Sequence, residues 1–163
     1  MPKTISQSDL KRFVDYDPLS GILTWKLPTS NRARIGSRFG TLVKGYRFGA
    51  IAGVRDYEHR FVWLYVHGEY PPKHIDHKNG IKTDNRIENL RLATRSQNLA
   101  NVAPHKDSFS GLKGVTAKRE KWQARIRING RQVSLGCFDT KEAAHTAYAV
   151  AAVANFGEFA RVA

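Results

Sequence analysis

An aspartate and a histidine stand side by side in the segment IDHKNG, residues 75–80. The carboxylate of Asp76 could hold Mg²⁺, an ion that keeps several waters and needs only one or two protein oxygens. His77 could act as a base, because an unperturbed imidazole has a pKa of about 6.5 and is largely neutral at physiological pH. With one further amide oxygen on the metal, the pair could hydrolyse a phosphodiester, which needs a cation on the phosphate and a base for the attacking water.

This chemistry depends on where the local strand ends. Neighbouring residues of a regular strand point to opposite faces, so Asp76 and His77 can serve one phosphate only where the strand ends or kinks. Asn79 and Gly80 follow at once, and the polar segment IKTDNRIEN leads to a second predicted strand, LRLAT. TRSQNLANV then predicts a helix with Thr94 as its N-cap. The order strand, loop, strand, helix is therefore expected for this part of the chain.

The segments HRFVW and IDHKNGIKTDNRIENLRLATRSQN resemble an HNH endonuclease of the kind found in phages and mobile introns, over residues 57–102. The resemblance implies a ββα-metal core that cleaves double-stranded DNA with Mg²⁺ or Mn²⁺. It implies that Asp76 is a metal ligand and that His77 is the general base. Asn89 matches the residue that braces the loop and orients the histidine, and Asn98 matches the helix residue that supplies the second metal oxygen. The final His of the family name is Asn98 in this chain.

Other polar residues near this motif have simpler interpretations. We interpret three of them as turn formers rather than ligands: Asn79, Asp84 and Asn85. His59 opens the HRFVW helix, and packing or capping explains it at least as well as chemistry does. The remaining histidines are interpreted as structural or solvent-facing: His67, His74, His105 and His145.

The charge of the chain favours a polyanionic partner. Lysine and arginine number 27 against 14 acidic residues, a formal net charge of +13. Such an excess favours nucleic acid or an anionic surface. No apolar run approaches the roughly 20 residues of a membrane span, and the N-terminus has no signal-peptide core. The single cysteine, Cys137, excludes an internal disulfide and a thiolate zinc cage, so an intracellular setting is expected.

The front part of the chain predicts a mixture of helices and strands. SQSDLKRFVDYD predicts a short helix with Ser6 or Ser8 as its cap, and GILTWK predicts a strand. GTLVKGYRFGAIAG predicts one or two further strands broken by glycines. A buried helix is expected from about His59 to His67, ended by Gly68.

The back part predicts a small basic sheet covered by one helix. GVTAK, KWQARIRI and RQVSLGCF predict three strands, the last two joined by the hairpin turn Asn129–Gly130. A helix capped by Asp139 and ended by Gly157 follows. Alternation along WQARIRI places arginines on one face and apolar residues on the other. We expect the outward face and its flanking turns to contact nucleic acid through Lys118, Arg119, Lys121, Arg125, Arg127 and Arg131.

Residues 111–163 also resemble the plant ethylene-response-factor (Apetala-two) DNA-binding domain, through GV, W and the skeleton LGCFDTKEAAHTAYAVAA. The resemblance implies a three-stranded sheet in the major groove, packed on one helix. Arg127 matches a base-contacting arginine of that family. Arg125, Gln132 and Ser134 depart from its usual glutamate, arginine and tryptophan, which puts any particular target sequence in doubt.

We therefore expect an α+β protein in four parts: an N-terminal basic α+β region (1–56), an HNH nuclease core (57–103), a linker (104–112) and an ethylene-response-factor-like DNA-binding domain (113–163). One such core has one active site, so a monomer would nick one strand, and double-strand cleavage would need a dimer or two successive events. A monomer or weak dimer is expected. A non-catalytic DNA-binding or regulatory protein on a nuclease-derived fold is the alternative. An RNA-binding protein is a third, because positive charge does not distinguish the two nucleic acids.

Overall fold

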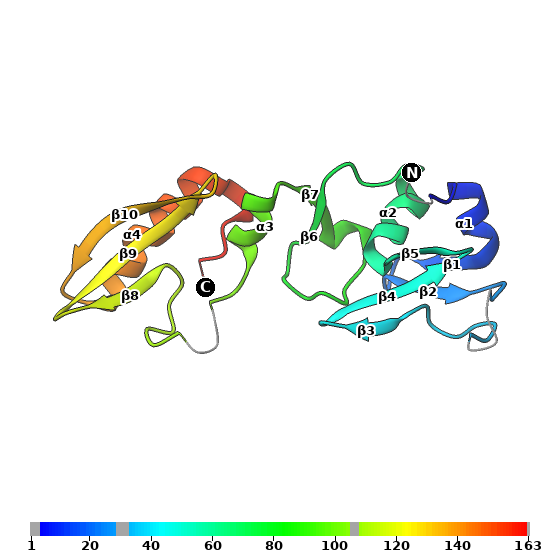
Figure 1. Cartoon of the computed structure of the whole chain (residues 1–163), viewed down its shortest axis with the longest axis horizontal. Coiled ribbons are helices and arrows are strands. Elements are labelled where there is room, and N and C mark those ends of the chain that lie inside the picture. Colours follow the sequence, from blue (N-terminus) through cyan, green and yellow to red (C-terminus); the bar gives the residue numbers. More distant parts are fainter. Residues whose placement is uncertain (1–3, 29–32, 105–107, 163) are drawn as a thin grey trace. The chain divides into compact units, whose positions relative to one another are not determined.

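The computed structural model describes residues 4–28, 33–104 and 108–162. It divides the chain into two compact units, Met1–Leu92 and Ala93–Ala163, which are described separately (Figure 1). Within the described residues no helix has the length and apolarity needed to cross a membrane. The partition expected at residues 104–112 stays a prediction, and His105 lies outside the described residues.

The first unit begins with a short helix and a hairpin. Helix α1 spans Gln7–Phe13, and its N-cap is Ser6, whose hydroxyl accepts a hydrogen bond from the Asp9 N–H at 3.0 Å. Strand β1 (Val14–Asp17) pairs antiparallel with β2 (Ile22–Trp25). The predicted helix through residues 14–17 is wrong, because Val14 is buried in the core as part of a strand with an alternating burial pattern.

A three-stranded meander and a buried helix follow. Strands β3 (Thr41–Val43), β4 (Tyr46–Ile51) and β5 (Val54–Tyr57) form the sheet, so the glycine-broken segment gives two strands and β5 adds a third. Helix α2 spans Glu58–His67 and ends at Gly68 in the left-handed conformation, as predicted. Its residues Phe61, Val62 and Leu64 enter the core with Leu10, Leu23 and Phe39.

The segment with the aspartate–histidine pair adds a small sheet to this unit. Strand β6 (His74–His77) and strand β7 (Leu90–Ala93) form a two-stranded sheet, and the 3-10 helix η1 (Ile87–Asn89) lies just before β7. Ile75 and Leu90 belong to the same hydrophobic core as α2. The core therefore fixes the strand that carries Asp76 and His77.

The second unit contains a three-stranded antiparallel sheet in the order β10-β9-β8. Its strands are β8 (Val115–Lys118), β9 (Lys121–Ile128) and β10 (Arg131–Phe138), which match the three predicted strands. Asn129 and Gly130 have φ angles of 50° and 81° in the turn between β9 and β10. Positive φ at both positions is the geometry that the Asn-Gly hairpin signal predicts.

Helix α4 (Lys141–Phe156) packs along this sheet (Figure 1). Its N-cap is Thr140, whose hydroxyl accepts from the Ala143 N–H at 3.1 Å, so the prediction of Asp139 as the cap is wrong by one residue. Ala144, Tyr148 and Ala152 of α4 are buried in this unit, and small alanines let the helix lie close to the strands. The 3-10 helix η2 (Gly157–Phe159) follows.

Helix α3 (Arg95–Asn101) also belongs to the second unit. Thr94 and Gln97 form a reciprocal capping box at its N-terminus, which confirms the predicted cap. The Lys113 ammonium donates to the Ala100 carbonyl oxygen, and the Arg161 N–H donates to the same oxygen at 3.2 Å. These bonds attach the C-terminal end of α3 to the rest of the unit.

Candidate active site and nucleic-acid interface

Asp76 and His77 are the last two residues of β6, and both are buried, with 4% and 5% of their surfaces exposed. The chain turns immediately after them: the Gly80 N–H donates to the His77 carbonyl oxygen at 2.8 Å, and the Lys78 N–H donates to the Asn89 carbonyl oxygen at 2.9 Å. The strand therefore ends at Asp76 and His77. The two neighbouring side chains can act on one phosphate only if the regular strand ends there, so the structure meets this requirement.

Asn89 braces the loop between β6 and β7 with its side chain. Its Oδ1 accepts from the Asn79 N–H at 3.0 Å, and its Nδ2 donates to the Asp84 carbonyl oxygen at 2.8 Å and to the Asn79 Oδ1 at 3.1 Å. Asn79 and Asp84 also close local turns, through bonds to the Ile81 N–H and to Arg86. The amide of Asn89 thus connects the start of the loop with its end.

The hydrogen bond to the His77 ring comes from Asn85, whose Oδ1 lies 3.0 Å from Nε2. Asn85 is only 1% exposed, and its Nδ2 donates to the Glu58 Oε2 at 2.7 Å. Glu58, the first residue of α2, is fully buried. The interpretation of Asn85 as a turn former missed these contacts, and neither Asn85 nor Glu58 was among the predicted site residues.

Aromatic rings surround the His77 imidazole. The His59 ring meets it edge-on at a centroid distance of 5.2 Å, and the Tyr46 ring lies at 5.9 Å. Burial lowers the pKa of His77, although the Asn85 bond acts in the opposite direction. Burial lowers the pKa of His59 to about 3, with a smaller contribution from His77. Both rings are therefore neutral near pH 7, and a neutral imidazole is the form that can accept a proton.

The N-terminal hairpin supports the loop that carries Asn85. The Tyr16 hydroxyl donates to the Asn85 carbonyl oxygen at 3.1 Å and accepts from the Ile87 N–H at 2.9 Å. Gly21 lies so close to this backbone that an added Cβ would stand 2.6 Å from the Asn85 carbonyl carbon. Residues of the N-terminal region therefore hold the site in place.

The residues around Asp76 suit a metal ion held by few protein atoms. Asp76 Oδ2 accepts from the Arg91 Nε and lies 2.9 Å from its Nη2. Among the described residues no three His, Cys, Asp or Glu side chains gather as a metal cage. This donor chemistry fits Mg²⁺, which retains most of its waters, better than a structural zinc ion.

Asn98 lies on α3, in the second unit, whereas Asp76, His77 and Asn89 lie in the first. Its side chain is partly buried, and its backbone N–H donates to the Thr94 carbonyl oxygen at 3.0 Å. The structure thus brings three of the four predicted site residues into one unit. The sharing of one metal ion by Asp76 and Asn98 stays a prediction.

The predicted nucleic-acid-binding residues all lie on the sheet of the second unit or in its turns. Ala124 and Ile126 of β9 are buried against α4, whereas Arg127 is exposed and Arg125 is half-buried. Arg125 donates to the Thr116 hydroxyl at 2.9 Å across the sheet. The remaining predicted contacts are exposed in the turns at either end of β9 and at the start of β10: Lys118, Arg119, Lys121 and Arg131.

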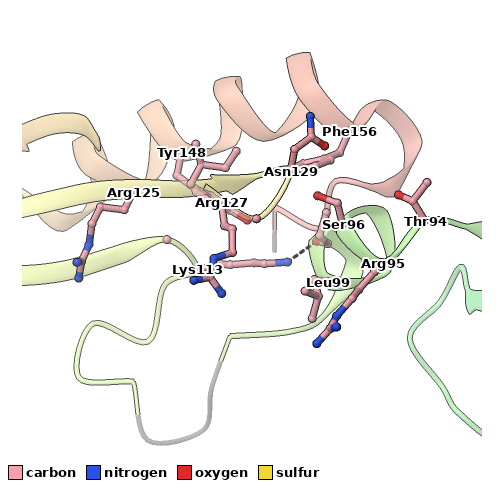
Figure 2. A pocket seen from close by; sticks show the side chains of 14 residues that line it. Thr94, Arg95, Ser96, Leu99, Lys113, Arg125, Arg127, Asn129, Tyr148 and Phe156 are labelled. Carbon is pink, nitrogen blue, oxygen red and sulfur yellow. Dashed lines mark hydrogen bonds between the residues drawn. The ribbon is translucent and has the colours of Figure 1, made fainter. Parts of the chain in front are cut away.

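A pocket in the second unit adds Arg95, a basic residue that the sequence did not single out (Figure 2). Arg125 and Arg127 line it together with Arg95 of α3 and Lys113, and none of its described lining residues is acidic. Burial lowers the pKa of Lys113 to about 8, with a further contribution from Arg161. Arg95 lies outside the basic run that includes β9, and only the fold brings it to the pocket.

Comparison with known proteins identifies two viral relatives. The family described as HNH endonuclease matches residues 56–100. "Protein 3.8" of Escherichia phage T7 is 32% identical over 106 residues, which cover 63% of this chain and 87% of that protein. An uncharacterized HNH endonuclease of Acanthamoeba polyphaga mimivirus is 36% identical over 105 residues, which cover 63% of this chain and 54% of that protein. The family match includes Asp76, His77, Asn89 and Asn98.

Proposed function

We propose that this chain, which belongs to the HNH endonuclease family, is a divalent-metal-dependent endonuclease that hydrolyses phosphodiester bonds of double-stranded DNA. The observation that carries the proposal is the position of His77: a buried, neutral imidazole at the end of a strand, beside the Asp76 carboxylate and held through its Nε2 by Asn85. The family resemblance implies products with 5′-phosphate and 3′-hydroxyl ends.

The mechanism assigns each polar residue a separate task. His77 takes a proton from the attacking water, and Asn89 maintains the loop that keeps His77 at the strand end. Asp76, paired with Arg91, and Asn98 would hold the Mg²⁺ or Mn²⁺ ion. When bound, the ion would neutralise charge on the scissile phosphate and favour departure of the leaving oxygen. The ββα-metal arrangement of β6, β7 and α3 is part of this proposal.

We also propose that residues 113–163 form the DNA-binding module, on the plan of the ethylene-response-factor domain. Support comes from the three-stranded sheet, the single packed helix and the outward arginines of β9. The pocket lined by Arg95, Lys113 and Arg127 has no acidic lining residue among those described, so it suits backbone phosphates. The partner is then duplex DNA inside a cell, as for a phage or homing-type enzyme.

The first test is cleavage of supercoiled plasmid in Mg²⁺ or Mn²⁺. His77→Ala should reduce cleavage at least about 100-fold, because general-base catalysis typically contributes 10²- to 10⁴-fold. His74→Ala is the matched control, because His74 is an exposed residue of the same strand. EDTA should abolish cleavage by the wild-type protein. Equal cleavage by wild type and His77→Ala would contradict the proposal, and salt-sensitive binding without any cleavage would favour the non-catalytic alternative.

A further inference from the structure

A chain of polar groups leads from the partly exposed Arg38, through buried Glu58 and Asn85, to the His77 ring. Arg38 Nη2 lies 3.5 Å from Glu58 Oε2, Asn85 Nδ2 donates to the same oxygen at 2.7 Å, and Asn85 Oδ1 lies 3.0 Å from His77 Nε2. Glu58 is fully buried and Asn85 almost so. Burial of a charged carboxylate costs free energy unless donors surround it. We therefore asked which function the buried Glu58 serves.

The partners of Glu58 show which chemical form it takes. Oε1 accepts from the Leu23 N–H at 3.3 Å, and Oε2 accepts from Asn85 and faces the Arg38 guanidinium. The Leu23 N–H and the Arg38 guanidinium are donors whichever way the Asn85 amide is turned, and both match an ionised carboxylate, which only accepts. Burial raises the pKa of Glu58, and Arg38 is the largest opposing influence. The guanidinium therefore helps to keep the acid ionised despite its burial.

An ionised Glu58 allows only one orientation of the Asn85 amide. The NH₂ group must face the carboxylate, because the reverse orientation would place the amide oxygen 2.7 Å from Glu58 Oε2 without a proton between them. The amide oxygen then faces His77 Nε2 at 3.0 Å. An amide oxygen only accepts hydrogen bonds, so Nε2 must be the protonated nitrogen. In a neutral imidazole the lone pair then resides on Nδ1.

We propose that Glu58 is a positioning residue that acts through Asn85 to hold neutral His77 in the Nε2–H tautomer, with Nδ1 as the atom that accepts the proton. The role of Nδ1 as proton acceptor rests on the proposed nuclease function. An O–H bond of the water breaks, its proton moves to Nδ1, and the resulting hydroxide oxygen forms the new bond to phosphorus. The bond from phosphorus to the leaving oxygen breaks, and that oxygen takes a proton from solvent. His77 keeps its Nε2–H bond to Asn85 throughout and later returns the Nδ1 proton to solvent.

The packing around the ring keeps the same nitrogen directed at Asn85. His59 contacts the ring of His77 edge-on at an interplanar angle of 84°, and the Tyr46 ring lies against it at 48°. His59 itself stacks on Tyr57 at 5.5 Å. The packed rings of His59 and Tyr46 restrict rotation of the His77 side chain, so the tautomer and the ring orientation are fixed together.

The tautomer can be measured directly on the full-length wild-type protein. Nitrogen-15 NMR of histidine-labelled protein at pH 8, without added metal, distinguishes a protonated ring nitrogen from one with a lone pair. Loss of signals in His77→Ala assigns the His77 ring. We expect the Nε2–H form to predominate, and a predominant Nδ1–H form or an even mixture would overturn the proposal. This readout does not require cleavage, so failure of the positioning role and failure of the nuclease function are distinguishable.

Two variants test the role of Glu58. In Glu58→Gln the new amide can donate or accept, so the Asn85 amide loses its fixed orientation. We expect a mixture of His77 tautomers in this variant. Its kcat should be lower by roughly 10- to 100-fold, with KM little changed. In the double variant Glu58→Gln/Asn85→Asp, the new carboxylate at 85 can accept from both the glutamine amide and His77 Nε2, so the Nε2–H form and part of kcat should return. Glu69→Gln, at an exposed acid, controls for the change in charge.

The outcomes of the variants are decisive in both directions. An unchanged tautomer population and kcat in Glu58→Gln would overturn the proposal, as would a double variant that folds but has no more Nε2–H form than the single one. Recovery of the tautomer in the double variant would support a role beyond simple packing. Should either variant fail to fold, the wild-type tautomer still decides the question.

Discussion

The side chains of Asn85 and Asn89 belong to the same loop but have different tasks. Asn89 bonds to Asn79 and to the Asp84 backbone, whereas Asn85 bonds to His77 and Glu58. We predict that Asn89→Ala lowers the free energy of unfolding by roughly 1–3 kcal/mol, because it removes three partly buried hydrogen bonds that hold the loop. Urea unfolding measures this change.

The same variant should reduce plasmid cleavage while leaving the neutral His77 ring in the Nε2–H form, since its contact to Asn85 is separate. Glu88→Ala is the control, because Glu88 is the exposed neighbour of Asn89. A change of tautomer in Asn89→Ala, equal to that in Glu58→Gln, would show that the two asparagines do not act separately.

The sequence motif identified the proposed reacting pair but not its supporting residues. Asp76 and His77 are recognisable because they stand in one HNH-like motif with Asn89 and Asn98, whereas an aspartate–histidine pair alone is usually an ordinary surface feature. Asn79, Asp84 and Asn85 look alike in the sequence, since all three suit turns. Only the fold shows that Asn85 is buried, because its burial depends on Tyr16 and Gly21, which are more than 60 positions away.

At the scale of elements, the β1–β2 hairpin positions the loop that carries Asn85. Gly21, at φ +72°, lies against the backbone of Asn85 and Arg86, where a Cβ has no room. Gly36 has a similar φ of +76°, but nothing lies within 4 Å of its Cβ position. We predict that Gly36→Ala costs about 1 kcal/mol of stability, the backbone penalty alone.

Gly21→Ala should cost about 2–4 kcal/mol, because the steric conflict with backbone adds to the same penalty. It should also reduce cleavage, since the loop must shift to accommodate the methyl group. Urea unfolding and plasmid cleavage of the two variants provide the comparison. Equal losses of stability in the two variants would mean that the β1–β2 hairpin does not pack tightly against the loop that carries Asn85.

Most elements could be predicted from local signals. The capping box of α3, the Asn129–Gly130 hairpin and the Gly68 end of α2 each result from interactions within a few residues. The wrong predictions concern boundaries: residues 14–17 form a strand, and Thr140 rather than Asp139 caps α4. Burial of Val14 in the core explains the strand at residues 14–17. Asp139 and Thr140 are neighbouring exposed residues that both suit an N-cap, so local preference alone does not separate them.

Lys113 in the pocket of the second unit should make DNA binding depend on pH, because its charge is lost at moderately high pH. The Lys113 pKa is lowered to about 8, so its charge is present below that pH and is lost as the pH rises through it. An unperturbed lysine titrates near 10.4. We predict that DNA affinity falls roughly threefold to tenfold between pH 7 and pH 9 at fixed salt, the effect of one lost phosphate contact.

Lys113→Arg provides the matched control, because a guanidinium stays protonated across this range. Fluorescence anisotropy with a labelled duplex measures both proteins. The variant should lose little affinity between the two pH values. A wild-type affinity that is flat with pH, or an equal fall in Lys113→Arg, would exclude Lys113 as a phosphate contact.

At the scale of the whole molecule, one chain offers one His77, so the proposed function provides one hydrolytic site for two antiparallel DNA strands. We predict that nicked circles accumulate from supercoiled plasmid before linear DNA appears, at a rate proportional to protein concentration. Gel electrophoresis over time, across a tenfold range of protein, measures this. The site chemistry sets this order, because one proton acceptor can activate one water at a time.

Linear product formed at once, with a rate that rises as the square of protein concentration, would instead indicate that two copies act together on opposite strands. The His77→Ala protein separates these cases further. Mixed with wild type in equal amounts, it should leave the nicking rate of monomers unchanged when DNA is in excess. In an obligate dimer about half of the pairs would be mixed, with one working site, and about a quarter would stay wild type, so nicked circles would replace part of the linear product. The concentration dependence and the mixing experiment therefore test the same count of active sites by independent means.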